Sequence, residues 1–128
     1  MSKHIIYQLF PRTFTNYNTN RVYNGSIEEN GCGKFNLITD VALAKIRALG
    51  VTHVWYTGVL EHATQTNYSK YGISADHPSV VKGRAGSPYA VKDYYDVDPD
   101  LAENVSLRMQ EFEALIERTH AAGLKLII

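Results

Sequence analysis

The sequence predicts an α/β fold whose strands run parallel, and three observations support this prediction. Two segments resemble each other: when Gly50 and Gly123 are aligned, "RALGVTHVW" lies over "HAAGLKLII", 73 residues further along the chain. The predicted strands are apolar runs without clean alternation, which is typical of parallel strands covered on both faces. Helices join the strands that follow them through one or two residues, whereas long loops lead from strands to helices.

Five main elements are expected, in the order strand, helix, strand, helix, strand. The strands are Ile5–Phe10, His53–Thr57 and Leu124–Ile128. Glycine adopts a left-handed conformation without strain, so Gly50 and Gly123 are expected to end the two helices.

Each predicted helix has an N-cap and an apolar face. The hydroxyls of Thr39 and Ser106 can each accept a backbone N–H of the first turn. In the first helix the residues at helical spacing are Ile38, Val41, Ala42, Ile46 and Leu49. In the second helix they are Phe112, Leu115, Ile116 and Thr119.

Composition excludes several classes of protein. The 128 residues fit one domain, and 13 basic residues balance 13 acidic ones, so no charge footprint for nucleic acid or an anionic membrane is present. A single cysteine, Cys32, excludes an internal disulfide and argues against a cysteine-built metal site. No apolar stretch approaches the ~20 residues that span a bilayer. The apolar run in "MSKHIIYQLFPR" is too short for a secretory signal, so a cytoplasmic location is expected.

The two strand-to-helix connections are the expected site of function. They cover residues 11–37 and 58–105, far above the ~4–6 residues that are typical of such connections. The second is rich in Tyr and Asp rather than in Ser, Gly and Lys, which argues against disorder. In α/β barrels the loops that leave the carboxyl ends of the strands build the site.

Four motifs in these segments carry a resemblance to a known family. They are "IIYQLFPRTFTN" (Ile5–Asn16), "GCGKFNLITDVALAKIRALGVTHVWYTGVLEHA" (Gly31–Ala63), "SPYAVKDYYDVDPDLA" (Ser87–Ala102) and the closing "EFEALIERTHAAGLKLII". In this order and spacing the chain resembles the start of the α-amylase family, glycoside hydrolase family 13, over nearly its whole length. Each motif is weak alone, whereas four in order are specific.

The resemblance implies a partial (β/α)8 TIM barrel: strands 1–3 with helices 1–2 and long strand-to-helix loops. Residues 1–128 would be the N-terminal segment of the catalytic domain. The apolar "GLKLII" would then be an internal strand of a longer protein. The family hydrolyses α-1,4-glucosidic bonds with retention, using an Asp nucleophile and a Glu acid from later strands. No catalytic residue is therefore expected within this chain, and the chain alone is expected to be inactive.

Three residues are candidates for substrate binding, Tyr89 through the family motif and Glu61 and His62 through their position after the second strand. Tyr89 matches the family tyrosine that stacks on the sugar, and a phenol ring offers a flat apolar face for this purpose. Glu61 and His62 follow the second strand, where they can bind sugar hydroxyls or instead form a surface ion pair. Asp93 is expected to brace its loop through backbone N–H groups. Trp55 is expected to fill space between the barrel and its helices.

Departures from the family pattern limit what the chain can bind. Ala90 stands where exo-acting α-glucosidases carry Asp, which favours an endo-acting, amylase-like or cyclodextrinase-like enzyme. Lys34 stands where a calcium loop would place its last aspartate, and a cation opposes calcium there. "DVDPD" fails as an EF-hand loop because Leu101 replaces the sixth-position Gly, so a solvated turn around Pro99 is expected. No metal or cofactor is assigned to this segment, although calcium is possible in the intact protein.

Three alternatives stay open. The same motifs occur in α-glucan transglycosylases and glucosyl isomerases of the family. A non-catalytic family member, such as a transporter-associated subunit, would keep the barrel and lose the carboxylates. An unrelated parallel α/β domain, complete at 128 residues, is the third. The expected partner is an α-glucan oligosaccharide or polysaccharide, with no nucleic acid or membrane partner, and the isolated chain is expected to self-associate through uncovered strands.

Overall fold

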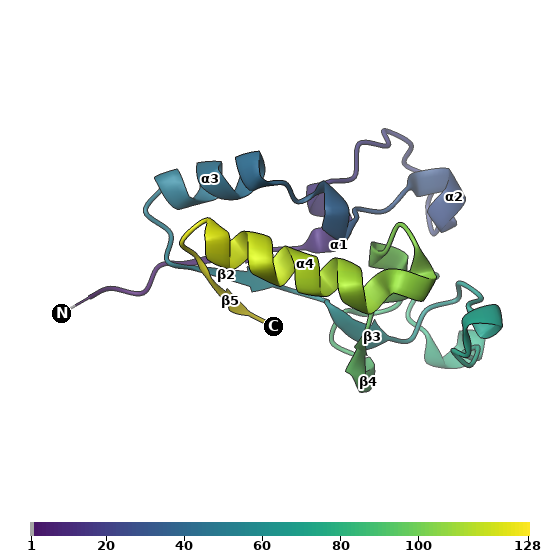
Figure 1. The fold of residues 1–128 in the computed structure, drawn as a ribbon. Coiled ribbons are helices and arrows are strands. Elements are labelled where there is room, and N and C mark those ends of the chain that lie inside the picture. Colours follow the sequence, from purple (N-terminus) through teal and green to yellow (C-terminus); the bar gives the residue numbers. More distant parts are fainter. Residues whose placement is uncertain (1) are drawn as a thin grey trace.

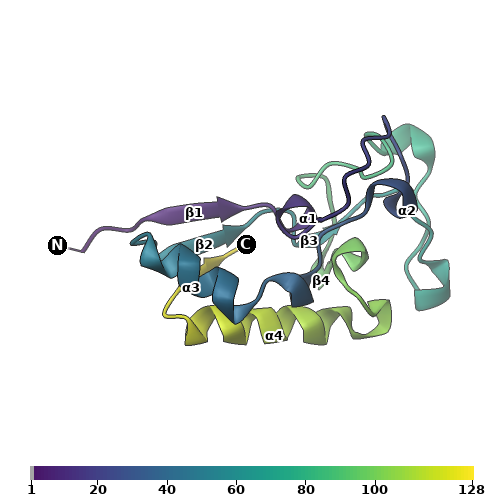
Figure 2. The same ribbon diagram turned by 90° about the horizontal axis from the view of Figure 1, so that it is seen from above.

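A computed structural model describes residues 2–128 and contains a three-stranded parallel sheet with two helices packed on one face (Figures 1 and 2). The strands and α-helices, in chain order, are β1 (Ile6–Leu9), α1 (Pro11–Phe14), α2 (Ile27–Asn30), α3 (Asp40–Ala48), β2 (His53–Tyr56), β3 (Leu60–His62), β4 (Val91–Val97), α4 (Arg108–Ala121) and β5 (Lys125–Ile127). No helix among residues 2–128 is both long and apolar enough to cross a membrane.

The main sheet has the order β1-β2-β5 and all of its strands are parallel, as predicted. Gln8 pairs with Trp55, and Trp55 pairs with Ile127. Strands that follow one another in the chain through a helix therefore lie side by side, as successive right-handed β-α-β units require. The α/β class and the parallel sheet are confirmed.

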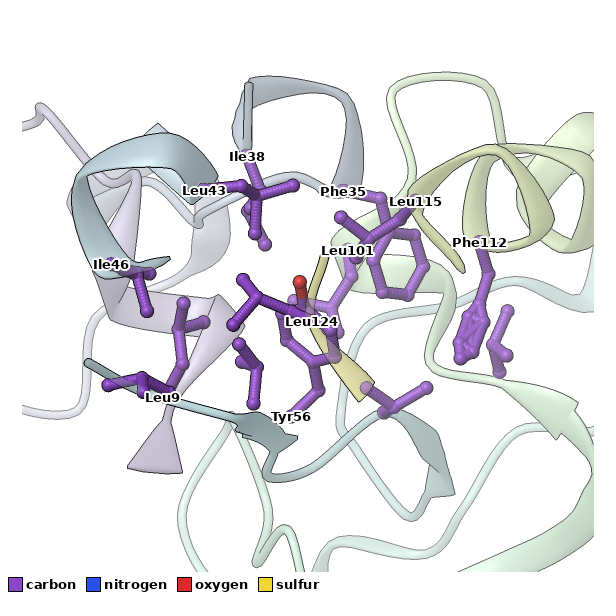
Figure 3. Close-up of a cluster of buried hydrophobic side chains, with 14 of the residues drawn as sticks. Leu9, Phe35, Ile38, Leu43, Ile46, Tyr56, Leu101, Phe112, Leu115 and Leu124 are labelled. Carbon is purple, nitrogen blue, oxygen red and sulfur yellow. The ribbon is translucent and has the colours of Figure 1, made fainter. Parts of the chain in front are cut away.

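The core lies between this sheet and its two helices (Figure 3). Val54 and Tyr56 of β2 point toward α3 and α4, because alternate residues of a strand face the same side. The Tyr56 hydroxyl lies 2.8 Å from Oγ1 of Thr119, which itself donates to the carbonyl of Leu115. The tyrosine hydroxyl is therefore the donor to Thr119, and both buried hydroxyls have a hydrogen-bond partner.

The predicted caps are partly right. Thr39 accepts the N–H of Ala42 and begins α3, as expected, and Gly50 and Gly123 have φ of 86° and 78°. The prediction that Ser106 is the N-cap of α4 is wrong. Asn104 instead caps a 3-10 turn at Val105–Leu107, and α4 follows this turn directly, beginning at Arg108.

The predicted apolar face of the first helix is also partly wrong. Val41 and Leu49 are 65% and 71% exposed, whereas Leu43 is fully buried beside Ile46. The helix is short, and its core-facing stripe is centred on Leu43 and Ile46. Periodicity alone did not separate this stripe from the neighbouring apolar residues.

The second long loop contains a two-stranded antiparallel sheet that the sequence did not predict. Leu60 of β3 pairs with Val97 of β4, and His62 pairs with Val91, with irregular register between them. This pairing joins residues 29 to 37 positions apart in the chain, so no short-range turn motif signals it. The small sheet extends from the carboxyl end of β2 and fixes the start and the end of the loop.

Candidate functional site

The two long loops meet at one end of the main sheet. They leave the carboxyl ends of β1 and β2, and in Figure 2 both run to the same side of the molecule, away from the turns that join α3 to β2 and α4 to β5. Because parallel strands end at a common edge, residues far apart in the chain come together here. This end is where the sequence places the functional residues.

Tyr89 borders a hollow of about 230 Å³ at the carboxyl end of β2. Its side chain is 70% exposed, and a turn in which the N–H of Ala90 donates to the carbonyl of Ser87 presents it. Trp55, Pro88 and Ile128 line the same hollow. An exposed phenol beside an indole and a proline offers the apolar faces on which a pyranose ring can stack.

The expected position of Trp55 is wrong. Its neighbours Val54 and Tyr56 are buried under the helices, so Trp55 lies on the opposite face of the sheet, where it is half-buried and lines the hollow with Tyr89. Strict alternation along β2 would have placed it there once either neighbour was assigned to the helix side. Trp55 is therefore a candidate site residue that the sequence interpretation missed.

Glu61 and His62 lie in β3 and are both buried, 5% and 4% exposed. Oε1 of Glu61 lies 3.7 Å from Nζ of Lys92, and burial raises the pKa of this carboxyl. Nε2 of His62 lies 3.1 Å from the carbonyl oxygen of Ala85. The pair is therefore not a surface ion pair, and direct contact of either residue with sugar stays a prediction.

Behind the loops lies a buried cluster of charged groups. Nη1 of Arg12 donates to Oδ2 of Asp100 at 2.9 Å and lies 3.8 Å from Oδ2 of Asp98. The Tyr68 hydroxyl also donates to Asp100, and Nζ of Lys34 donates to the Asp100 carbonyl at 2.6 Å. Two cations thus compensate two buried carboxylates, as buried charges require.

This cluster corrects the expectation of a solvated turn around Pro99. The turn is present as a short 3-10 helix, but Asp98 and Asp100 are 1% and 0% exposed. The carboxylates point inward to Arg12, which follows β1 and lies 88 positions before Asp100 in the chain. Local sequence cannot reveal such a distant partner, and acidic residues around a proline are more often exposed.

Burial shifts the pKa values of the groups around the cluster. It raises the pKa of the Cys32 thiol to about 11. It also raises the pKa of the Tyr68 phenol, with the carboxylate of Asp100 adding to the effect. Burial raises the pKa of Asp98 and lowers that of His62. The thiol of Cys32 and the phenol of Tyr68 are therefore uncharged at neutral pH. The cluster connects the two long loops through the contacts of Arg12, Lys34 and Tyr68 with Asp100.

Asp93 and Lys34 behave as structural residues. Oδ1 of Asp93 accepts the N–H of Tyr95 at 2.7 Å, which is the loop brace that the sequence predicts. Lys34 directs its ammonium group to two backbone carbonyls, those of Asp100 and Ala102, so it fills a cation position itself. Among residues 2–128, no three His, Cys, Asp or Glu side chains come together in a way that could hold a metal ion.

A larger hollow of about 390 Å³ lies between the two loops. It is lined by polar groups of both loops, among them Ser26, Thr66 and Arg84. No aromatic side chain lines it. The hollow beside Tyr89 is therefore the better platform for a sugar ring.

Comparison with solved structures identifies similar folds. An α-amylase from Lactobacillus plantarum is 26% identical and matches 96% of this chain and 21% of its own, with a TM-score of 0.60. An α-glucosyl transfer enzyme is 27% identical and matches 96% of this chain and 16% of its own, with a TM-score of 0.55. A cyclic α-maltosyl-(1→6)-maltose hydrolase from Arthrobacter globiformis shares the fold, at 21% identity, 96% and 24% coverage and a TM-score of 0.56.

No family model and no curated protein sequence matches the chain. The chain spans about a fifth of the length of the enzymes in these solved structures. The structural matches extend over nearly all of its residues. Both the motifs and the fold of the chain thus resemble those of enzymes of the α-amylase family, glycoside hydrolase family 13.

Proposed function

We propose that residues 1–128 form the N-terminal part of the (β/α)8 catalytic barrel of an enzyme that hydrolyses α-1,4-glucosidic bonds in α-glucans. The observation that carries the proposal is the joint match of the motifs and the fold to enzymes acting on α-glucosidic substrates, over 96% of this chain. The parallel sheet β1-β2-β5 supplies the first three barrel strands in this reading. The proposed hydrolysis proceeds with retention and needs two carboxylates that flank the scissile bond.

In this proposal the chain binds and orients sugar but carries no catalytic carboxylate. The ring of Tyr89 stacks on a pyranose, and Trp55 extends the apolar wall of the same hollow. Glu61 and His62 are buried and do not line that hollow. The buried cluster of Arg12, Asp98 and Asp100 holds the loops in register, which keeps Tyr89 in place when substrate arrives.

Calcium, where the whole enzyme binds it, is proposed to lie outside this segment. The ammonium group of Lys34 already donates to the carbonyls of Asp100 and Ala102, and a second cation beside it would be repelled. We therefore expect residues 1–128 alone to show no calcium-dependent change in thermal stability.

The test uses the full-length protein that contains this chain. It is expected to release reducing ends from starch and maltooligosaccharides, and NMR of the first product is expected to show the α-anomer, as retention requires. Residues 1–128 alone, purified rigorously, are expected to be inactive on the same substrates and on chromogenic α-glucosides. Activity that tracks the 128-residue chain through purification would contradict the assignment of the carboxylates elsewhere.

A transglycosylase is the second candidate, because one of the similar structures is an α-glucosyl transfer enzyme. Product analysis separates the two activities. A hydrolase yields products shorter than the substrate, whereas a transglycosylase also yields longer ones when a maltooligosaccharide is the only sugar present. An isomerase yields an isomer of unchanged length. A full-length protein without turnover on any α-glucan would support the non-catalytic alternative.

A further inference from the structure

The side chain of Tyr23, in the first long loop, is 99% exposed. Among residues 2–128 its ring makes no aromatic or cation–π contact. Exposure alone needs no explanation, because single aromatic and aliphatic side chains are common on protein surfaces. Two further features distinguish Tyr23: the fixed backbone that presents its ring, and the hollow of polar side chains that the ring borders.

Asparagine side chains fix the backbone that leads to Tyr23. Oδ1 of Asn16 accepts the N–H of Asn18 at 3.2 Å, and Oδ1 of Asn18 accepts the N–H of Asn20 at 2.7 Å. In such turns an asparagine binds the backbone two residues further on, which holds a loop in one conformation. The side-chain amides of Asn18 and Asn20 both donate to the carbonyl of Glu29, at 3.2 and 2.9 Å. The loop is thereby attached to α2.

The residues on either side of Tyr23 are held as well. Asn30 accepts the N–H of Val22 at 2.9 Å through Oδ1 and donates to the carbonyl of Val22 at 2.8 Å through Nδ2. Asn24 has a φ of 49°, in the left-handed region where asparagine is enriched. Its Oδ1 accepts the N–H of Arg84, in the second long loop, at 2.8 Å. Because the backbone is fixed at both neighbours, a ligand that binds the Tyr23 ring has little backbone to order.

Beside Tyr23 lies a hollow of about 530 Å³ whose walls are largely side-chain amides. Asn20, Arg21 and Asn24 line it, and all three are exposed. Nη1 of Arg21 donates to the carbonyls of Asn18 and Asn20, at 3.0 and 2.7 Å. Among residues 2–128, the other guanidinium nitrogens of Arg21, Oδ1 of Asn20 and Nδ2 of Asn24 have no partner. The hollow therefore offers a ligand one amide acceptor and several donors.

This set of groups matches a neutral ligand that is rich in hydroxyls. A hydroxyl both donates and accepts, so it can use Oδ1 of Asn20 together with the amide of Asn24 or the guanidinium of Arg21. No carboxylate lines the hollow, which argues against a metal ion as the ligand. Val22 is the only aliphatic side chain in the lining, whereas a protein partner would need apolar anchors at the centre of its interface.

The hollow beside Tyr23 is separate from the hollow beside Tyr89. The two share no lining residue. In Figures 1 and 2 the loop that leads to α2 lies apart from the end of β5, where Ile128 borders the Tyr89 hollow. A ligand that binds Tyr23 therefore does not occupy the position where the Tyr89 ring would stack on a sugar.

We infer that Tyr23 and the hollow beside it form a second carbohydrate-binding site, which holds a segment of an α-glucan chain away from the bond that is cleaved. The phenol ring stacks on a pyranose, and Asn20, Arg21 and Asn24 bind its hydroxyls. The identity of the sugar rests on the proposed function, whereas the class of ligand, a neutral carbohydrate, follows from the hollow itself. The site raises the affinity of the full-length enzyme for long chains, because two linked contacts bind together more tightly than either does alone.

The test compares binding and turnover in the full-length protein. Retardation in native gels that contain amylopectin, run in the cold to slow hydrolysis, measures affinity for long chains. We expect Tyr23→Ala to raise the dissociation constant for amylopectin roughly threefold to tenfold, which corresponds to the loss of one stacked ring. The kcat/KM for maltotriose should change much less, because this short substrate is bound at Tyr89. Tyr23→Phe keeps the ring and should keep the binding.

A Tyr89→Ala background separates the two sites. The retardation that remains in Tyr89→Ala should fall further when Tyr23→Ala is added. Tyr95→Ala is the matched control, since Tyr95 is 92% exposed but lines neither hollow. This variant should keep the retardation of the wild type. The melting temperature of Tyr23→Ala should also match that of the wild type, because the ring is almost fully exposed.

The inference is overturned if Tyr23→Ala binds amylopectin like the wild type, if Tyr23→Phe loses as much affinity as Tyr23→Ala, or if Tyr95→Ala is impaired to the same extent. A lowered melting temperature of Tyr23→Ala would also overturn it, because another part of the full-length protein would then cover the ring. A full-length protein that turns over no α-glucan contradicts the proposed function instead. In that case the amylopectin gels still decide whether Tyr23 binds carbohydrate.

Discussion

At one end of the main sheet the chain passes from helix to strand through residues 49–52 and 122–124, and at the other it passes from strand to helix through residues 10–39 and 57–107. The short turns rest on a single left-handed glycine each, Gly50 and Gly123. The long loops rest on buried charges, a small extra sheet and close backbone contacts. The long-loop end, which carries the candidate site, is therefore held in place by contacts between residues that are far apart in the chain, whereas the short-turn end is not.

The largest expected effect comes from the buried charges. Asp100→Ala leaves Arg12 without its nearest carboxylate and Tyr68 without its acceptor, in a position that is fully buried. Removing one partner of a buried ion pair typically costs about 3–5 kcal/mol. Urea unfolding monitored by circular dichroism measures the loss.

The matched control is a cation at the short-turn end. Arg47 donates to the carbonyl of Val51 at 3.3 Å and forms no ion pair among residues 2–128. We expect Arg47→Ala to cost less than about 1 kcal/mol, the range of a single neutral-acceptor hydrogen bond. If Asp100→Ala and Arg47→Ala lowered the free energy of unfolding equally, buried charges would not distinguish the long-loop end from the short-turn end.

Gly50 at the short-turn end and Gly86 in the second long loop allow the backbone of the two ends to be compared. Gly50 and Gly86 both have positive φ, 86° and 72°. An added Cβ meets nothing within 4 Å at Gly50 but lies 1.8 Å from the Ala63 carbonyl oxygen at Gly86. Gly50→Ala should cost only the left-handed penalty of about 1–2 kcal/mol. Gly86→Ala should cost more than that, because backbone must move as well, and melting temperatures of the two variants rank them.

The same contrast explains what the sequence could predict. At the short-turn end, Gly50 and Gly123 act on their immediate neighbours, so local patterns predicted where both helices end. The sheet order followed from the handedness of successive β-α-β units.

At the loop end, position depends on partners that are distant in the sequence. Asp98 and Asp100 are buried because Arg12 reaches them, and the pairing of β3 with β4 joins the two ends of a loop. Local sequence patterns can predict neither the ion pairs of Arg12 nor the pairing of β3 with β4. Tyr89 was found only because a family motif carries it, and Trp55 was assigned to the wrong face because the strand was considered without its alternation.

A smaller effect is expected from the ion pair at the start of α4. Nη2 of Arg108 donates to Oδ2 of Asp96 at 2.6 Å, with Nε also bonded to Oδ1. Burial opposes ionisation of Asp96, but the hydrogen bonds from Arg108 and the N–H of Val97 hold its pKa below the ordinary value. Both side chains remain partly accessible to water, so the pair is expected to contribute only about 1 kcal/mol.

The pKa of Asp96 is shifted in the direction opposite to that of Asp98. A lowered pKa means that the stabilisation is present above the unfolded pKa of aspartate and is lost as pH falls through the folded value. Arg108→Ala should therefore lower the free energy of unfolding at neutral pH and have little effect in acid. A difference between variant and wild type that persists undiminished well below about pH 3, where aspartates are protonated, would contradict the assignment.

The smallest effect on stability, and the most direct test of the site, is expected from Tyr89→Ala. The side chain is 70% exposed, so its removal should change the free energy of unfolding by less than about 0.5 kcal/mol. Stacking of the ring on a sugar contributes about 0.5–1.5 kcal/mol beyond the area it buries, so kcat/KM of the full-length enzyme for maltooligosaccharides should fall roughly threefold to tenfold. Tyr89→Phe keeps the ring and should keep most of the activity.

Tyr94 supplies the control for Tyr89, because it is 72% exposed but does not line the hollow that Tyr89 shares with Trp55. Tyr94→Ala should leave both the melting temperature and kcat/KM close to those of the wild type. If Tyr89→Ala behaves like Tyr94→Ala, Tyr89 is an ordinary surface tyrosine and the hollow beside Trp55 is not a sugar subsite. If Tyr89→Ala instead unfolds the protein, the tyrosine belongs to the structure of the loop end. Tyr89 is a sugar-binding residue only if Tyr89→Ala keeps the fold intact and lowers kcat/KM.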